Sequence, residues 1–258
     1  MKRVALVVSD LAGTLVDFGS RAPVAAFMAC FAKHGVPISE AEARAPMGMH
    51  KRDHIRAILQ DRDIRERWKQ VYQRLPGEKD VQRLFDEFIP LQLEVLPGYL
   101  DLIPGAVRFS DTLSHSGISL TVTTGYSNQM LAVVIAALKR EGIEPRFGIS
   151  AEDVPAGRPA PHLIHACMKA CGVTESNRVI KVGDTVADIE AGKHAGCLTV
   201  GVTDTGNLCG LDEQELLALD TGSLLRMRED AAGKLKRAGA DFVIPGISHF
   251  ADVLAQLS

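Results

Sequence analysis

The chain has 258 residues, of which 46% are apolar and 24% are charged, a balance typical of a soluble globular enzyme. Its net charge of −3 and its scattered basic residues argue against a nucleic-acid partner. Because there is no apolar run of roughly 18 residues, as a membrane span needs, and no secretory signal pattern, we expect a cytoplasmic protein. The five cysteines include no CxxC pair, which favours free thiols in a reducing compartment.

The chain begins with a short, unbroken apolar run, Val4–Val8, which predicts a buried strand of a parallel sheet. Later runs predict further strands at Ile118–Thr123, Val179–Val182, Leu198–Val202 and Asp241–Ile244. Helical patterns alternate with them at Met130–Leu138, Pro161–Met168, Ala187–His194 and Ser248–Leu257. This alternation predicts an α/β fold built on a doubly wound, mostly parallel sheet.

The long segment between the first two predicted strands, about 22–100, contains helical patterns and no strand. One apolar stripe predicts either the core of this segment or a dimer seam, and by spacing alone internal packing is expected: Val24, Phe27, Met28 and Phe31. We predict an α/β core domain of residues 1–20 and 101–258 with an inserted helical cap domain of residues 21–100. Ligands of open α/β sheets bind at the carboxyl ends of the strands, so the cap is expected to close over that edge.

Polar residues follow three of the predicted strands, where their side chains would converge. Asp10 ends the first strand, and a carboxylate can attack phosphorus when a cation shields the approaching charge. Thr124 and Arg158 lie in turns or loops where they would bind a phosphoryl group. Asp184 and Asp188 follow the third strand, and carboxylates near Asp10 favour Mg²⁺, with Asp184 reaching the ion and Asp188 orienting the loop. Taken singly, each position also fits a turn, a surface ion pair or a helix N-terminus.

Two further residues bear on which bond is broken. Ala12 stands two residues after Asp10, where an acid would be needed to protonate an alcohol leaving group. The absence of an acid at this position indicates that the leaving group is not an alkoxide. Lys51 offers another way to release the leaving group. The local pattern alone predicts a solvated lysine at the start of a helix.

The order of these elements resembles that of the haloacid dehalogenase superfamily. The finer pattern is similar to the phosphonoacetaldehyde hydrolase family, the phosphonatases, over nearly the whole chain. The motifs that carry this resemblance are Ala22-Pro23 through Ala29, Glu42-Ala43-Arg44-Ala45-Pro46-Met47-Gly48, Lys51-x-Asp53-His54, Thr123-Thr124-Gly125-Tyr126, Asp153-Val154-Pro155-Ala156-Gly157-Arg158-Pro159, Lys181-Val182-Gly183-Asp184-Thr185 and Gly206-Asn207-x-x-Gly210-Leu211.

The resemblance implies that Asp10 is the nucleophile and that Lys51 forms a Schiff base with a substrate aldehyde. It implies Mg²⁺ held by Asp10, the backbone carbonyl of Ala12, and Asp184, with Asp188 in a supporting role. Residues implied to bind the substrate or its phosphoryl group are Thr124, Arg158, Gly125, Tyr126, Met47 and His54. A homodimer formed through the cap and a place in 2-aminoethylphosphonate degradation are also implied.

The chemistry gives these implied roles a physical basis. Direct scission of a C–P bond would expel a carbanion, whereas an iminium on Lys51 accepts the electron pair and leaves an enamine. No oxygen then leaves, so Ala12 needs no acid. Lys51 must be neutral to attack an aldehyde, and we expect the neighbouring Arg52 and desolvation by the cap to disfavour its charged form.

Three positions depart from the family pattern, Ser9, Leu11 and Ser20, and none removes a functional group that this chemistry requires. The alternatives are a Mg²⁺-dependent phosphate-ester phosphatase, a related hydrolase for another phosphonate aldehyde or ketone, and a non-enzymatic binding protein. Ala12 argues against the phosphatase, and the presence of both Asp10 and Lys51 argues against the binding protein.

Overall fold

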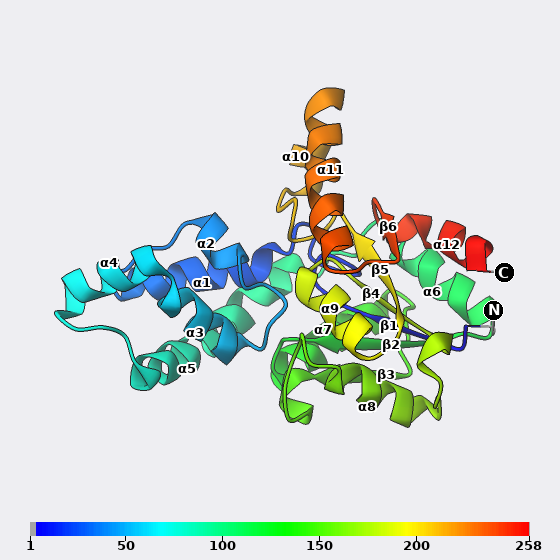
Figure 1. The fold of residues 1–258 in the computed structure, drawn as a ribbon, viewed down its shortest axis with the longest axis horizontal. Coiled ribbons are helices and arrows are strands. Elements are labelled where there is room, and N and C mark those ends of the chain that lie inside the picture. Colours follow the sequence, from blue (N-terminus) through cyan, green and yellow to red (C-terminus); the bar gives the residue numbers. More distant parts are fainter. Residues whose placement is uncertain (1–3, 258) are drawn as a thin grey trace.

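The computed structural model describes residues 4–257 and shows a single six-stranded sheet with helices on both sides (Figure 1). The strand order is β3-β2-β1-β4-β5-β6, and every neighbouring pair is parallel. The strands are β1 (Leu6–Ser9), β2 (Ser119–Thr124), β3 (Phe147–Ser150), β4 (Val179–Gly183), β5 (Leu198–Val202) and β6 (Phe242–Ile244). The predicted doubly wound α/β fold is confirmed. Residues 1–3 and 258 of the predicted core domain lie outside the described residues.

Strand β3 was not predicted from the sequence. It lies at the edge of the sheet beside β2 alone, and its first residue, Phe147, is 40% exposed. An edge strand covered on only part of its surface has no unbroken apolar run, so the pattern that indicated the other five strands is missing here.

Helices cover both faces of the sheet because the strand residues alternate in direction. Leu6 and Val8 are buried with residues of α8 and α9, whereas Val7 is buried with residues of α6, α7 and α12. The helices of this part are α6 (Ala106–His115), α7 (Asn128–Arg140), α8 (His162–Cys171), α9 (Val186–His194), α10 (Glu213–Leu217), α11 (Thr221–Arg237) and α12 (Phe250–Leu257). Helix α11 projects from the body of the molecule, and Ala231 and Leu235 are its buried residues (Figure 1).

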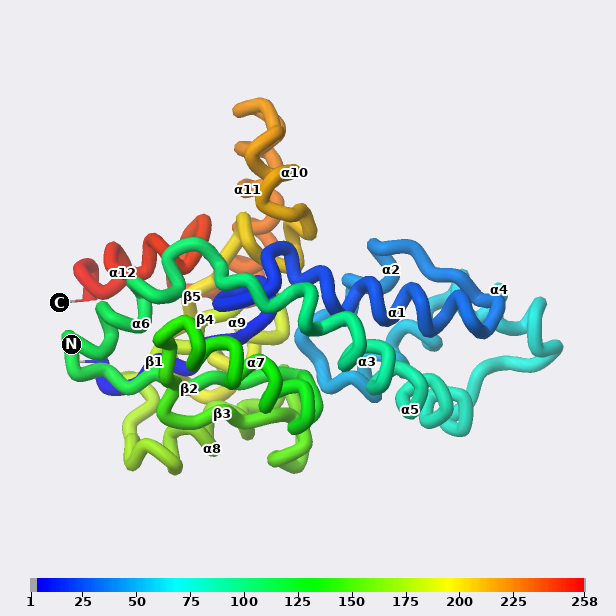
Figure 2. The backbone as a smooth tube through the Cα atoms, turned by 180° about the vertical axis from the view of Figure 1, so that it is seen from behind, coloured from blue at the N-terminus to red at the C-terminus, as the bar shows by residue number. Residues whose placement is uncertain are grey.

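Five helices between β1 and β2 form a group at one end of the molecule, away from α6 and α12 (Figures 1 and 2). They are α1 (Arg21–Lys33), α2 (Glu40–Arg44), α3 (Lys51–Gln60), α4 (Arg62–Tyr72) and α5 (Glu78–Val95), and we call residues 21–95 the helical segment. Val24, Phe27 and Phe31 of α1 are buried, and Phe27 stacks on Phe88 of α5 with ring centroids 4.2 Å apart. Met28 stays exposed. The division into core and cap domains stays a prediction.

Both ends of the helical segment meet beside the carboxyl end of β1. Val16 pairs with Leu102 in an antiparallel bridge, and the Ile103 amide donates to the Leu15 carbonyl at 2.9 Å. The segment therefore leaves and rejoins the sheet at the edge where the polar strand-end residues lie.

Two further observations concern the chain as a whole. All five cysteines are free thiols, as the lack of a CxxC pair indicated. Among residues 4–257, none of the helices has the length and apolar character that crossing a bilayer requires.

Candidate active site

The polar strand-end residues meet because their strands are neighbours. Asp10 follows β1, and β1 lies between β2, which ends at Thr124, and β4, which precedes Asp184. The helical segment adds Lys51 at the first residue of α3. One cavity is lined by most of the predicted site residues: Asp10, Ala12, Met47, Lys51, Thr124, Gly125, Tyr126, Arg158 and Asp184. Asp188 and His54 lie outside this lining.

Three buried carboxylates form the negative side of the site. One oxygen from each of Asp10, Asp184 and Asp188 lies within 4.8 Å of the others. Burial and the other two carboxylates raise the pKa of Asp184 well above its ordinary value, and burial also raises the pKa of Asp10. Asp184 accepts a hydrogen bond from the Asn207 amide on Oδ2, while its buried Oδ1 has no hydrogen-bond partner. These oxygens fit a hard divalent cation.

Asp188 is held by cations of the protein itself. It contacts Arg158 and lies 2.7 Å from the Lys181 ammonium, and it accepts a 2.6 Å hydrogen bond from the Thr185 hydroxyl. Burial opposes ionisation of Asp188, but the two cations outweigh burial and lower its pKa to about 2. The carboxylate is thereby engaged in fixing Arg158 and the start of α9, which leaves Asp10 and Asp184 for an ion.

Arg158 connects Asp10, the candidate nucleophile, to Asp188. Its Nη1 lies 2.9 Å from Asp10 Oδ1, and its side chain is almost fully buried. Burial disfavours the charged form, but Asp10 and Asp188 overcome this and raise the pKa of Arg158. Lys181, which sequence reasoning did not single out as a site residue, is fully buried in β4. A lysine inside an apolar strand is a signal for such a site, because buried lysines require an anionic partner.

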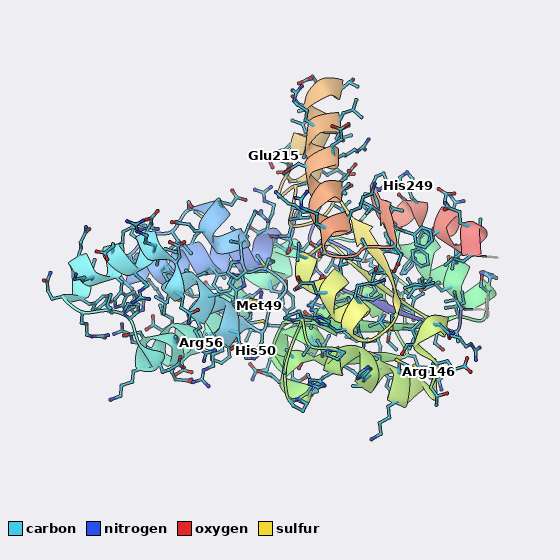
Figure 3. The ribbon with its side chains drawn as sticks, in the orientation of Figure 1. Met49, His50, Arg56, Arg146, Glu215 and His249 are labelled. Carbon is cyan, nitrogen blue, oxygen red and sulfur yellow. The ribbon has the colours of Figure 1, made fainter. Side chains whose placement is uncertain are left out.

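Thr124 and Gly125 form the turn after β2. The Tyr126 amide donates to the Thr124 hydroxyl at 3.1 Å, so Thr124 forms the ST-turn that the sequence also allowed. A Cβ atom on Gly125 would lie 2.5 Å from the Met49 carbonyl oxygen. Glycine is therefore required where the loop before α3 approaches β2, and Figure 3 shows Met49 and His50 at this junction.

Lys51 lies between two aromatic rings and is 3% exposed. Its ammonium is 5.4 Å from the Phe27 ring centroid and 5.3 Å from that of Tyr126, and 4.0 Å from the Met47 sulfur. Burial, followed by the charge of Arg158, lowers the pKa of Lys51 to about 7. The cation that lowers the pKa of Lys51 is thus Arg158, and not Arg52 as the sequence predicted.

Arg52 is the cation that sequence reasoning assigned to Lys51, and the structure corrects this. Its side chain is 42% exposed and lies 3.8 Å from the Glu78 carboxylate, in an ion pair at the surface. Adjacent residues on a helix point in different directions, so closeness in sequence did not bring Arg52 to the amine. Arg158 lies more than a hundred residues away in sequence, and the fold brings its charge close enough to lower the pKa of Lys51.

His54 and Tyr126 flank the lysine in different ways. His54 donates from Nε2 to the Ala43 carbonyl at 2.8 Å and packs on Phe27 with ring centroids 4.0 Å apart, which places it behind the cavity rather than in its lining. Burial, with Lys51 beside it, lowers the pKa of His54 well below its ordinary value. Tyr126 lines the cavity, and burial raises the pKa of its phenol.

Asp17 is a buried acid that sequence reasoning missed. Its carboxylate accepts hydrogen bonds from the amides of Arg21 at 2.9 Å and Ala22 at 3.1 Å, in the first turn of α1. Burial raises the pKa of Asp17 to about 7 despite these amides and the charges of Arg44 and Lys51. The signal in the sequence was an acid just before a predicted helix, where it stabilises the unpaired amides.

Comparisons with known proteins show the family to which the sequence and the fold are similar. Residues 4–196 match the family model of haloacid dehalogenase-like hydrolases. The chain is 40% identical over 242 residues to a phosphonoacetaldehyde hydrolase of Hahella chejuensis, covering 94% of this chain and 82% of that protein. It is 36% identical over 255 residues to a phosphonoacetaldehyde hydrolase of Bacillus cereus, covering 99% and 97%. A solved phosphonoacetaldehyde hydrolase-like protein from Oleispira antarctica superposes with a TM-score of 0.97 at 37% identity, covering 98% and 92%.

Proposed function

Since the chain belongs to the phosphonoacetaldehyde hydrolase family of the haloacid dehalogenase-like hydrolases, we propose that it hydrolyses the C–P bond of phosphonoacetaldehyde to acetaldehyde and phosphate. The observation that carries the proposal is that Lys51 and Asp10 line one cavity. An amine and a carboxylate that reach the same small substrate can act on its aldehyde and its phosphorus at the same time.

Lys51 acts on the aldehyde carbon. Its neutral amine adds to the carbonyl and water leaves, which gives an iminium when the imine nitrogen is protonated. When the C–P bond breaks, its electron pair moves into this iminium and forms an enamine. Protonation of the enamine carbon and hydrolysis release acetaldehyde and restore Lys51. A pKa of about 7 makes the neutral amine available near neutral pH.

Asp10 acts on phosphorus. Its carboxylate forms an aspartyl-phosphate as the carbon leaves, and water then releases phosphate. Arg158, 2.9 Å from Asp10, and the hydroxyl and amide groups at Thr124 hold the phosphoryl oxygens. Asp10, the Ala12 carbonyl and Asp184 would hold Mg²⁺, which supplies positive charge to offset that of the phosphoryl group and the attacking carboxylate.

Ala12 distinguishes this reaction from ester hydrolysis. It lines the cavity next to the attacking carboxylate and carries no acid. The test is to incubate the protein and Mg²⁺ with phosphonoacetaldehyde, and separately with a simple phosphate ester, and to measure acetaldehyde and phosphate. Equal release of both products with little ester cleavage is expected. Ester cleavage without acetaldehyde would identify a phosphatase instead, and turnover of only another phosphonate aldehyde or ketone would reassign the substrate.

The family relationship also supports a setting for the reaction. We place the enzyme in the cytoplasm, in 2-aminoethylphosphonate degradation, after a transaminase has made the aldehyde. We also propose a homodimer formed through the helical segment, where Met28 leaves an exposed apolar side chain on α1. Sedimentation of the purified protein tests the dimer, and a monomer at working concentrations would contradict it.

A further inference from the structure

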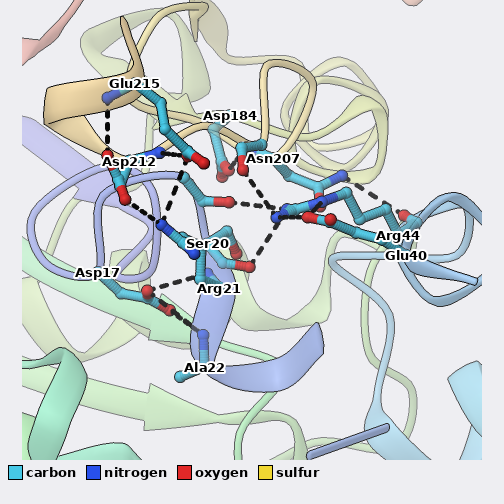
Figure 4. A network of polar contacts seen from close by, with 12 residues as sticks. Asp17, Ser20, Arg21, Ala22, Glu40, Arg44, Asp184, Asn207, Asp212 and Glu215 are labelled. Carbon is cyan, nitrogen blue, oxygen red and sulfur yellow. Dashed lines mark hydrogen bonds and ion pairs between the residues drawn. The ribbon is translucent and has the colours of Figure 1, made fainter. Parts of the chain in front are cut away.

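Arg44, at the end of α2, joins the helical segment to two loops of the α/β part. Its guanidinium donates to the Gly19 carbonyl at 2.7 Å, to the Asn207 side-chain oxygen at 3.2 Å and to the Gly210 carbonyl at 3.0 Å (Figure 4). Glu40, one turn earlier on α2, accepts from the same guanidinium at 2.7 Å. The side chain of Arg44 is 12% exposed, so these contacts are largely shielded from water.

One of these two loops, residues 206–210, also contacts Asp184, a proposed ligand of the cation. The Asn207 amide donates to Asp184 Oδ2 at 2.7 Å, and the Asn207 side chain donates back to the Arg44 carbonyl at 3.4 Å. Asn207 is therefore bonded to Arg44 on one side and to Asp184 on the other (Figure 4). With Oδ2 held by the loop, Asp184 Oδ1 is the buried oxygen left without a hydrogen-bond partner.

Glycines let this loop pack closely against both partners. A Cβ atom on Gly206 would overlap the Asp184 side chain, and one on Gly210 would lie 2.8 Å from the Arg44 Nε atom. The loop therefore packs against Asp184 at one end and against Arg44 at the other. A displacement of the loop at Arg44 would change the position of the amide that orients Asp184.

From these contacts we infer that Arg44 is a positioning residue for the cation site: it fixes the 206–210 loop, and the loop's Asn207 amide orients Asp184. This inference rests on the proposed function for the identity of the ion, Mg²⁺, and deepens it by linking the placement of α2 to the metal carboxylate. Arg44 itself does not touch the reacting groups. Its guanidinium suits the role because a planar fork binds two loops at once, which a lysine ammonium does less well.

Calorimetric titration of Mg²⁺ into the folded, substrate-free protein tests the inference. Arg44→Ala is expected to weaken Mg²⁺ binding by about tenfold or more, the usual effect of losing a residue that orients a metal ligand. Arg44→Lys is expected to fall between wild type and Arg44→Ala. Asn207→Ala removes one acceptor for Arg44 but keeps the backbone amide, so a smaller loss is expected.

Arg67→Ala is the matched control. Arg67 contacts Glu42 of α2 and the Pro37 carbonyl but none of the loops around Asp184, so it anchors the same helix without reaching the site. Binding within twofold of wild type is expected for this variant. If Arg44→Ala does not fold in a thermal melt, Arg44→Lys and Asn207→Ala still supply the test.

The outcomes separate this inference from the proposed function. Unchanged Mg²⁺ affinity in folded Arg44 variants would overturn the positioning role and leave Arg44 as a structural contact of α2. Equal weakening of Mg²⁺ binding by Arg67→Ala would also overturn the positioning role of Arg44. If wild type released no acetaldehyde but Arg44→Ala still weakened Mg²⁺ binding, the proposed reaction would fail and the positioning role would stand.

Discussion

Lys51 holds its ammonium nitrogen 5.3 Å from the centroid of the Tyr126 ring. An aromatic face attracts a cation and so favours the charged form of the amine. Burial opposes this and is the larger effect, since the pKa of Lys51 falls to about 7. Charged and neutral amine are therefore both populated near neutral pH, as the proposed Schiff-base role of Lys51 requires.

Replacing Lys51 by arginine keeps the positive charge but removes the amine that is proposed to form the imine. For Lys51→Arg we expect the loss of acetaldehyde release to be on the order of 10³-fold or more, as when a covalent nucleophile is deleted. The measurement is kcat/KM on phosphonoacetaldehyde. Arg52→Lys, at the exposed neighbouring position, is the control and should stay near wild type. Activity near wild type in Lys51→Arg would refute the Schiff-base role.

The pH dependence of kcat/KM should follow the neutral fraction of Lys51. This fraction rises with pH through about 7, so we expect an acid limb with an apparent pKa near that value. Asp17, when ionised, raises the pKa of Lys51, and with its own pKa of about 7 it is partly ionised in this pH range. Asp17→Asn removes the charge and keeps an oxygen for the α1 amides, so the limb should move to lower pH. Asp101→Asn, at an exposed position where the helical segment rejoins the sheet, should leave the acid limb in place. An acid limb that does not move in Asp17→Asn would contradict the coupling between Asp17 and Lys51.

Asp10→Asn separates the two halves of the reaction. An amide does not attack phosphorus, so release of phosphate should stop. Lys51 is unchanged, so the imine should still form, and borohydride should still attach the substrate to the protein. Mass spectrometry of the reduced sample measures this adduct, with Lys51→Arg as the negative control. Full turnover by Asp10→Asn would rule out the aspartyl-phosphate route.

Removal of Mg²⁺ should stop phosphate release and spare the imine. Chelation is expected to abolish turnover, and added Mg²⁺ to restore it, while borohydride trapping on Lys51 persists throughout. Asp184→Asn should raise the Mg²⁺ concentration needed for half-maximal activity by at least about tenfold, since loss of a residue that merely orients a ligand costs that much. Asp252→Asn, an exposed acid of α12, serves as control. Turnover that survives chelation would disprove the metal requirement.

The fold was largely readable from the sequence because buried parallel strands have unbroken apolar runs. That signal located five strands and failed for β3, whose Phe147 is partly exposed at the sheet edge. Helix α11 was also not predicted; its buried residues, Ala231 and Leu235, are too few to mark an apolar stripe.

The convergence of the candidate residues on one cavity was readable from the sequence, but their individual contacts were not. Strand ends predicted the convergence of Asp10, Thr124 and Asp184, because neighbouring parallel strands end at one edge. The cation beside Lys51 was wrongly predicted to be Arg52, since sequence proximity does not give side-chain direction. Lys181 was missed because it lies within an apolar run and its partner, Asp188, is brought to it only by folding.

The bridge between Val16 and Leu102 has a consequence for protein engineering. The chain departs from the sheet and returns to it at almost one point, so residues 17–101 resemble a removable cassette. Exchanging this cassette for another of different length would leave the strand register in place, but it would remove the Arg44 contacts to the loop that orients Asp184. It would also take away Lys51, the residue proposed to bind the aldehyde. Under the proposed function, the residue that attacks phosphorus, Asp10, and the residue that binds the aldehyde, Lys51, thus belong to separate stretches of the gene, which Arg44 joins in the folded protein.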